Sequence, residues 1–137
     1  MGKISVIIPT HNRADLLPRA IKSVQDQTRA VDEIIVVSDG STDNTEETVK
    51  KIAEQDSRIQ LIAYYPGHNG NYARNRGIEA ATGEFIAFLD DDDEWLPRKT
   101  ELQMQLFEKD PDVGLVYSSQ NCIYSVTGIT YQTQPMW

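Results

Sequence analysis

Hydrophobic positions along the chain follow two patterns, short continuous apolar runs and longer segments with apolar residues at helical spacing. The runs, rich in β-branched or aromatic residues, predict strands at 3–9, 31–38, 58–63 and 85–89. The periodic segments predict helices at about 14–27, 43–55, 72–81 and 97–109. Strands and helices that alternate with short connections predict a parallel sheet with helices on both faces.

Beyond the last of these helices, the pattern predicts a fifth strand at 113–118. A pair of short strands is expected between Asn121 and Tyr131, around a turn at Thr127-Gly128. The 137 residues contain no internal repeat or linker and suit one domain. We therefore expect residues 1–137 to form a single domain of the α/β class, a three-layer α/β/α sandwich with a mostly parallel, Rossmann-like central sheet.

The apolar run at 85–89 leads directly into five consecutive acidic residues, Asp90 to Glu94. So continuous a run indicates a strand that is buried on both faces. Carboxylates this close repel one another, and a hard divalent cation such as Mg²⁺ or Mn²⁺ would relieve the repulsion. If the backbone stays extended, Asp90 and Asp92 point the same way. A solvated acidic turn is the alternative interpretation.

Two more polar clusters follow the first two predicted strands, Thr10 to Asn12 and Asp39 to Asp43. Ligands of open α/β sheets bind at the carboxyl ends of the strands, so we expect these clusters to meet the acidic run at one edge. The sequence has neither a P-loop motif nor a G-x-G-x-x-G motif after the first strand. A phosphate ligand would therefore depend on a metal at the acids.

Charge, hydropathy and cysteine content limit the classes of binding partner and the cellular compartment. A formal net charge of -8 argues against nucleic acid, and a polyanionic ligand would need a metal or local arginines. No apolar run approaches the ~20 residues that cross a bilayer, and the N-terminus lacks the layout of a signal peptide. The single cysteine, Cys122, excludes an internal disulfide and indicates a reducing compartment. We expect a cytoplasmic protein, with peripheral association at the inner face of the membrane left open.

Three segments resemble the motifs of family 2 glycosyltransferases with the GT-A fold. They are Ser5–Arg13 (SVIIPTHNR), Glu33–Asp43 (EIIVVSDGSTD), and Ala73–Ile78 (ARNRGI) followed by Gly83–Asp93 (GEFIAFLDDDD) with its D-x-D signature. The similarity runs in order from about Lys3 to Tyr117. It implies transfer of a sugar from a nucleotide-diphosphate donor, usually with inversion, with Mg²⁺ or Mn²⁺ as cofactor, in polysaccharide or cell-wall synthesis.

The same resemblance implies roles for individual residues. Asp92 would be the principal metal ligand with Asp90 nearby, and Asp91 would reach the ribose or the metal. Asp39 would accept a hydrogen bond from the base, with capping of the turn or helix that follows as the alternative. Arg74 would assist at the phosphates or the base, unless it is a surface residue. The donor-binding set is Pro9, Thr10, Asn12, Asp39, Ser41, Arg74 and Asp91.

Several other side chains are expected to be structural. Asp93 and Glu94 would serve the start of the helix at 97–109, in which Leu102 and Leu106 would point inward. Trp95 would pack in the core or on a neighbouring loop. His11 and His68 have no evident Ser or Cys partner, so nucleophilic catalysis is poorly supported.

The resemblance also implies a feature that the chain lacks. Inverting members place an Asp or Glu general base beside the acceptor, and Gln120–Trp137 contains no acid. We expect that base beyond Trp137, so that this chain would bind a nucleotide-diphospho-sugar, with a UDP-sugar favoured, but transfer it poorly to a saccharide or lipid-linked acceptor. A non-catalytic nucleotide-sugar-binding module is the alternative. An exposed sheet edge near the C-terminus would invite pairing into a homodimer.

Overall fold

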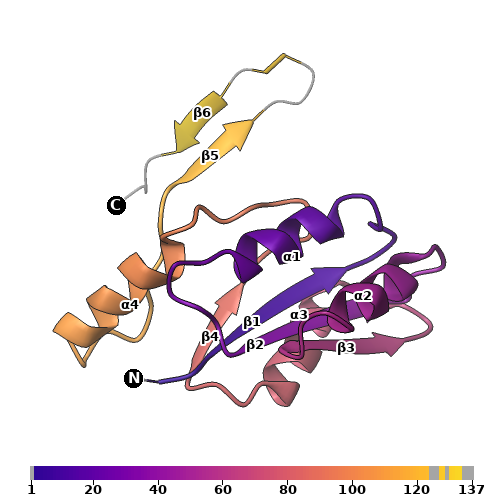
Figure 1. Ribbon diagram of the computed structural model, residues 1–137, viewed down its shortest axis with the longest axis horizontal. Helices are drawn as coiled ribbons and strands as arrows, with labels where there is room; N and C mark the ends of the chain where they lie inside the picture. Colours follow the sequence, from indigo (N-terminus) through magenta and orange to yellow (C-terminus); the bar gives the residue numbers. More distant parts are fainter. Residues whose placement is uncertain (1, 124–126, 129, 134–137) are drawn as a thin grey trace. The chain divides into compact units, whose positions relative to one another are not determined.

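The computed structural model describes residues 2–123, 127–128 and 130–133. The chain divides into two compact units, Met1–Glu101 and Leu102–Trp137. The first unit is built on a parallel sheet of four strands in the order β3-β2-β1-β4 (Figure 1). The strands are β1 (Ile4–Thr10), β2 (Glu33–Asp39), β3 (Ile59–Tyr64) and β4 (Phe85–Phe88). The predicted parallel α/β architecture is therefore confirmed.

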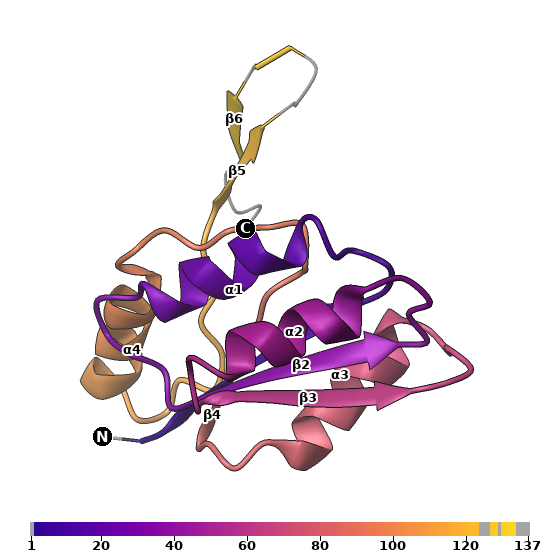
Figure 2. The same cartoon turned by 45° about the vertical axis from the view of Figure 1, so that its right-hand side comes forward.

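Helices cover both faces of this sheet (Figures 1 and 2). On one face lie α1 (Leu17–Gln25) and α2 (Thr45–Ala53), and on the other lies α3 (Gly70–Ala80). The helical spacing seen in the sequence becomes the buried side of α1, formed by Leu17, Ala20, Ile21 and Val24. All seven residues of β1 are buried between the two helical layers.

Small residues let α3 approach the sheet closely. Ala73 and Gly77 are buried, and a Cβ atom at position 77 would lie 2.4 Å from Cγ2 of Ile7. A larger residue there would have to push the helix off β1. This contact fixes α3 over the centre of the sheet, so its Arg74 lies near the carboxyl ends of the strands.

The expectation that the apolar run at 85–89 is buried on both faces is wrong. β4 pairs with β1 at the edge of the sheet, and its residues Ile86 and Phe88 are 38% and 45% exposed. Register places them beside Ser5 and Ile7, on the face that α3 covers. Because α3 packs on β1 and β2, its layer leaves β4 open. A run of apolar residues cannot tell how far a neighbouring layer extends.

The last helix and the segment after it differ from expectation in two ways. α4 (Lys99–Lys109) buries Thr100 and Met104, whereas Leu102 and Leu106 are each 48% exposed and do not point inward. Residues 113–118 form no strand, because β-propensity alone provides no hydrogen-bonded partner. The predicted pair of short strands is confirmed as the antiparallel hairpin of β5 (Gln120–Ile123) and β6 (Thr130–Thr133).

Among the described residues, every helix is too short or too polar to cross a membrane.

Candidate functional site

The loop between β1 and α1 joins the polar clusters at the carboxyl edge of the sheet. Nδ1 of His11 lies 2.7 Å from the carbonyl oxygen of Asp39, and NH1 of Arg13 lies 3.4 Å from Oδ2 of Asp92. Since a carbonyl oxygen only accepts, Nδ1 carries the proton of this imidazole. Asp39 and Asp92 therefore flank one short loop, which confirms the expected convergence of the clusters.

The acidic run folds back after β4 instead of staying extended. The amide of Asp93 donates to the carbonyl oxygen of Asp90 over 3.1 Å, which closes a turn. Asp90 accepts a 2.6 Å bond from Arg74 of α3, while Asp92 pairs with Arg13 of the β1–α1 loop. The extended alternation that would point Asp90 and Asp92 the same way is therefore wrong. Their carboxylates engage partners from different elements around one turn.

Asp91 is the acid that is tied most directly to the sheet. Oγ1 of Thr10 donates to Oδ2 of Asp91 over 2.8 Å, and Thr10 is only 4% exposed at the end of β1. Just before the turn, the amide of Leu89 donates to the carbonyl oxygen of Ile7 over 3.1 Å. The turn thus starts from a rigid position, which places predicted site residues Thr10 and Asp91 in contact.

Asn12 and Ser41 connect two loops. The backbone of Asn12 has a φ of 50°, a left-handed conformation that asparagine tolerates. Its Oδ1 accepts from the amides of Thr42 (2.7 Å) and Asp43 (3.2 Å), and its own amide donates to Oγ of Ser41 over 3.1 Å. Both predicted donor-binding residues thus hold the β1–α1 loop against the β2–α2 loop.

The carboxylate of Asp39 binds the loop between β3 and α3. Its Oδ1 accepts from the amide of His68 over 2.8 Å, so it does not cap the helix that follows. Gly40, with a φ of 66°, allows this approach, because a Cβ there would lie 2.4 Å from the amide nitrogen of Gly67. Asp39 is half-buried and held between two loops.

An aromatic cluster lies near the carboxylate of Asp39. The ring of His68 stacks on Tyr72 with centroids 4.1 Å apart, Tyr72 meets Tyr64 edge to face at 5.2 Å, and the guanidinium of Arg76 lies 5.3 Å from the centroid of Tyr72. Burial, together with the nearby carboxylate of Asp39, raises the pKa of Tyr64. The sequence patterns did not assign this cluster, although its four members recur at intervals of four residues.

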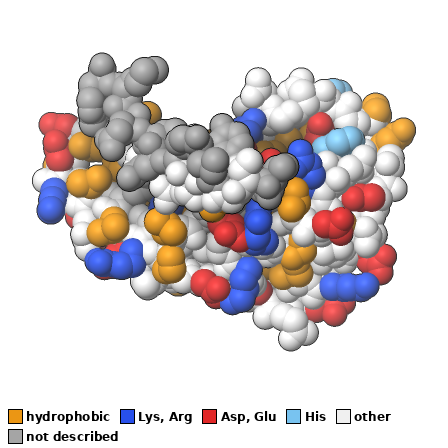
Figure 3. Space-filling view, turned by 90° about the horizontal axis from the view of Figure 1, so that it is seen from above, with side chains coloured by type: hydrophobic (Ala, Val, Ile, Leu, Met, Phe, Trp, Pro, Cys, Tyr) orange, Lys and Arg blue, Asp and Glu red, His pale blue; other side chains and the backbone are white. Residues whose placement is uncertain are grey.

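Arginines form ion pairs with the carboxylates of the acidic turn. Besides Arg13 and Arg74, Arg19 of α1 pairs with Glu94 at 3.0 Å. The expected role of Asp93 and Glu94 at a helix start is wrong, because α4 begins only at Lys99. Burial and the neighbouring carboxylates, Asp92 foremost, raise the pKa of Asp93. Acidic and basic side chains are interspersed on the face shown in Figure 3.

The carboxylates suit a divalent cation that arrives with a phosphate ligand. Asp90, Asp91 and Asp92 offer the oxygen donors that Mg²⁺ and Mn²⁺ prefer. In the part of the chain that the structure describes, no three acidic, histidine or cysteine side chains are arranged to hold a metal. Mg²⁺ commonly takes one or two carboxylates and completes its shell with water and phosphate, so a ready cluster of three is not required.

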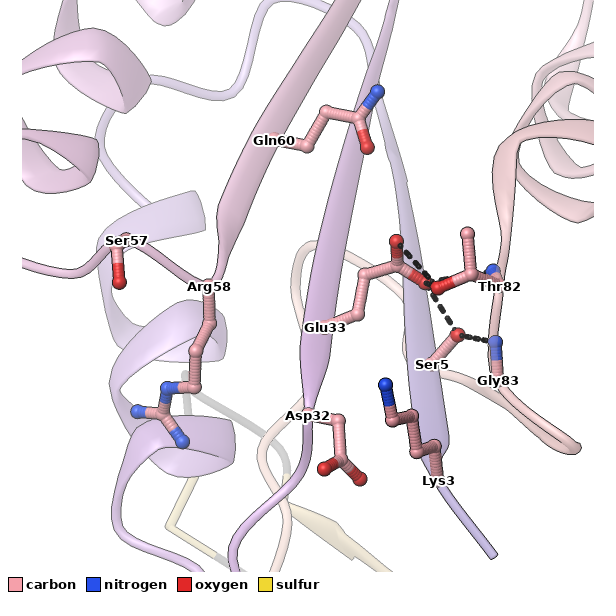
Figure 4. Close-up of a pocket in the computed structure, with 9 residues that line it drawn as sticks. All are labelled: Lys3, Ser5, Asp32, Glu33, Ser57, Arg58, Gln60, Thr82 and Gly83. Carbon is pink, nitrogen blue, oxygen red and sulfur yellow. Dashed lines mark hydrogen bonds between the residues drawn. The ribbon is translucent and has the colours of Figure 1, made fainter.

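A cavity of about 200 Å³ lies at the opposite, amino edge of the sheet (Figure 4). Glu33 of β2 accepts hydrogen bonds from Oγ of Ser5 and from the amide of Thr82, and Ser5 in turn accepts from the amide of Gly83 (Figure 4). These bonds join β1, β2 and the turn before β4. Glu33, Ser5 and the backbone of residues 82–83 therefore bind one another in this cavity and position β4.

Comparisons with known proteins match most of this chain. The model of glycosyl transferase family 2 matches residues 5–137. A GalNAc(5)-diNAcBac-PP-undecaprenol beta-1,3-glucosyltransferase from Campylobacter jejuni is 41% identical over 131 residues, which are 93% of this chain and 40% of that protein. A UDP-Glc:alpha-D-GlcNAc-diphosphoundecaprenol beta-1,3-glucosyltransferase from Escherichia coli is 36% identical over 88% of this chain and 46% of its own. The chain thus spans less than half of either relative.

Solved structures show the same fold. A mannosyltransferase from Pyrobaculum calidifontis in complex with GDP-Man and Mn²⁺ is 30% identical, with a TM-score of 0.74 over 82% of this chain and 34% of that one. TarS 1–349 from S. aureus in complex with UDP is 27% identical, with a TM-score of 0.71 over 78% of this chain and 32% of that one. The expected GT-A type of α/β fold is confirmed.

Proposed function

This chain belongs to glycosyl transferase family 2, and from that premise we propose that its carboxyl edge binds the nucleotide diphosphate of a sugar donor. The observation that carries the proposal is the β1–α1 loop, which contacts Asp39 through His11 and Asp92 through Arg13. Those contacts bring a hydrogen-bond acceptor for a base and a group of acids for a cation to one edge. Similar structures hold GDP-Man with Mn²⁺ or UDP, which supports this ligand class.

The family resemblance suggests roles for the acidic turn, and its contacts support them. Asp92 and Asp90 would hold Mg²⁺ or Mn²⁺, and Asp91, fixed by Thr10, would reach the ribose or the metal. A bound divalent cation supplies charge stabilisation for the departing nucleotide diphosphate. Arg74 then exchanges the carboxylate of Asp90 for phosphate oxygens, which a guanidinium binds with two parallel hydrogen bonds.

Base recognition is assigned to the other side of the loop. One oxygen of Asp39 accepts from the amide of His68, and we assign the other oxygen to an N–H group of the base. Pro9 and Thr10, both buried at the end of β1, line the nucleoside pocket. Asn12 and Ser41 act on the donor indirectly, because their hydrogen bonds set the shape of the loop between the two halves of the site.

Transfer to an acceptor hydroxyl, with inversion, requires a general base, which we do not assign to Gln120–Trp137 because that segment contains no acid. The two glucosyltransferases described above are named for diphosphoundecaprenol-linked acceptors, which supports a lipid-linked saccharide as acceptor. By itself, the chain binds donor and transfers slowly. Rapid transfer by this chain would show that one of its other acidic residues serves as the general base.

Calorimetry tests the donor site. We expect Mn²⁺ to strengthen UDP binding by at least about tenfold, and Asp92→Ala to abolish that gain. Asp26→Ala is the matched control, because it removes an exposed carboxylate that pairs with Lys22 on α1. Unchanged affinity in Asp92→Ala would contradict the role of that residue. A wild-type chain that binds neither UDP nor GDP would contradict the proposed function.

A further inference from the structure

One side of α1, continued into the turn after it, carries three polar side chains at intervals of four residues. They are Arg19, Ser23 and Gln27, and this spacing places them in a row along the helix. We call them the polar row. Arg19 binds the acidic turn, and Ser23 and Gln27 bind the segment that follows it, so the row runs alongside residues 92–100.

Arg19 holds the turn itself. Its NH2 donates to the carbonyl oxygen of Asp92 over 3.0 Å, and its Nε lies 3.0 Å from Oε1 of Glu94. A planar guanidinium can make both bonds at once, which a lysine cannot do with the same geometry. Arg19 therefore fixes the backbone of Asp92 rather than its carboxylate.

Ser23 and Gln27 hold the residues just after it. Oγ of Ser23 accepts from the amide of Trp95 over 3.1 Å, and the Trp95 side chain is buried. Nε2 of Gln27 donates to the carbonyl oxygen of Leu96 over 2.9 Å, while its Oε1 accepts from the amide of Thr100 over 3.0 Å. Gln27 is 6% exposed, so these bonds form away from water, where unpaired groups are costly.

We infer that the polar row of α1 positions Asp92 for the cation, an inference that rests on the proposed function. β1 holds the turn on its first side through Thr10 and the ladder bond to Leu89. The polar row holds it on the second side. A carboxylate whose backbone is fixed at both sides loses less conformational entropy when it binds a cation, as outer contacts do for metal ligands generally.

Charge and geometry must be separated in the test. Removing Arg19 would also remove a positive charge near the acids, which by itself would strengthen cation binding. Arg19→Lys keeps the positive charge but cannot make both guanidinium bonds at once. Ser23→Ala changes no charge. Matched controls are Arg98→Lys, in an exposed pair with Glu101, and Ser57→Ala at the amino edge of the sheet.

The experiment measures Mn²⁺ affinity by electron paramagnetic resonance of the free ion, with the whole 137-residue chain. Ser23→Ala should weaken binding about tenfold and Arg19→Lys about threefold, with both controls within about twofold of wild type. Hydrogen exchange should speed up at residues 92–96 in both variants and stay unchanged in β1 and β2. If Ser23→Ala does not fold, Arg19→Lys decides, because that side chain is half exposed.

The outcomes separate the two levels of the proposal. Wild-type affinity for Mn²⁺ in both variants, with or without faster exchange, would overturn the inference and leave the proposed function standing. A wild-type chain that binds no Mn²⁺ would overturn the metal-dependent function and the inference with it. Weaker binding in the variants, with intact controls, would support the positioning role.

Discussion

The two edges of the central sheet use the same kinds of charged side chain to opposite effect. At the amino edge, Arg58 and Asp56 pair at 2.7 Å with side chains only 29% and 12% exposed. At the carboxyl edge, Arg13 and Asp92 pair at 3.4 Å with side chains 45% and 50% exposed. Enclosed charges with many partners hold strands together, whereas exposed charges can change partners.

Energetics explain why only one edge suits a ligand. An exposed ion pair contributes roughly 0–1 kcal/mol, so a cation or a phosphate can replace one partner at little cost. Breaking an enclosed pair leaves a charge without its partner and costs several times more, about 3–5 kcal/mol when fully buried. The carboxyl edge is therefore the exchangeable edge, although the cavity of about 200 Å³ lies at the other.

The strongest test of the contrast is Asp56→Asn. Asp56 accepts from Nε and NH2 of Arg58 and from Nε2 of Gln25, at 2.7–2.9 Å. Loss of these charged bonds should lower the free energy of unfolding by about 2 kcal/mol and the melting temperature by roughly 10 °C, measured by calorimetry. Donor binding by the folded variant should stay at the wild-type value. Weaker Mn²⁺-dependent UDP binding would contradict the separation of the two edges.

The contribution of Asp56 to the free energy of unfolding should also depend on pH. Hydrogen bonds from Arg58 hold the pKa of Asp56 far below the 3.8 of the unfolded chain, against the effect of burial. A lowered folded pKa gives stability that is complete above that unfolded value and is lost as the pH falls toward the folded one. The unfolding free energy of wild type should therefore fall more steeply below pH 4 than that of Asp56→Asn. Parallel acid titrations of the two proteins would contradict this role.

A smaller effect is expected from Thr10→Val, which keeps the shape of a buried side chain and removes the bond to Asp91. The free energy of unfolding should fall by about 1 kcal/mol, and UDP affinity in Mn²⁺ by about fivefold. Thr10→Ser is the control, since its hydroxyl can still donate. If Thr10→Val binds as wild type does, Asp91 does not need this bond to serve the site.

Arg13→Gln should change stability least. Its exposed pair with Asp92 contributes little, so unfolding should shift by less than about 0.5 kcal/mol. Removing this competing positive charge should instead tighten the binding of Mn²⁺ alone by about two- to threefold at low salt. The gain should disappear in high salt, where the interaction is screened. Weaker Mn²⁺ binding in this variant would show that Arg13 assists the cation.

Sequence patterns predicted the features that depend on neighbours along the chain. Alternating strands and helices fixed the parallel order, so the meeting of Asp39 and the acidic turn at one edge followed from topology. The partners of the acids could not be predicted the same way, because Arg13 and Arg19 reach them across the fold. The burial predicted for Ile86 and Phe88 was wrong for the same reason, since burial of a strand depends on the layer that packs against it.

Paramagnetic broadening by Mn²⁺ tests the central claim most directly. Mn²⁺ would be added to the ¹⁵N-labelled chain in the presence of UDP, and amide signals at the two edges of the sheet would be compared. We predict that residues 10–13, 39–41 and 90–94 broaden first while 32–33, 57–58 and 82–83 stay sharp. Broadening that begins at the amino edge, or that is uniform over the sheet, would contradict the account.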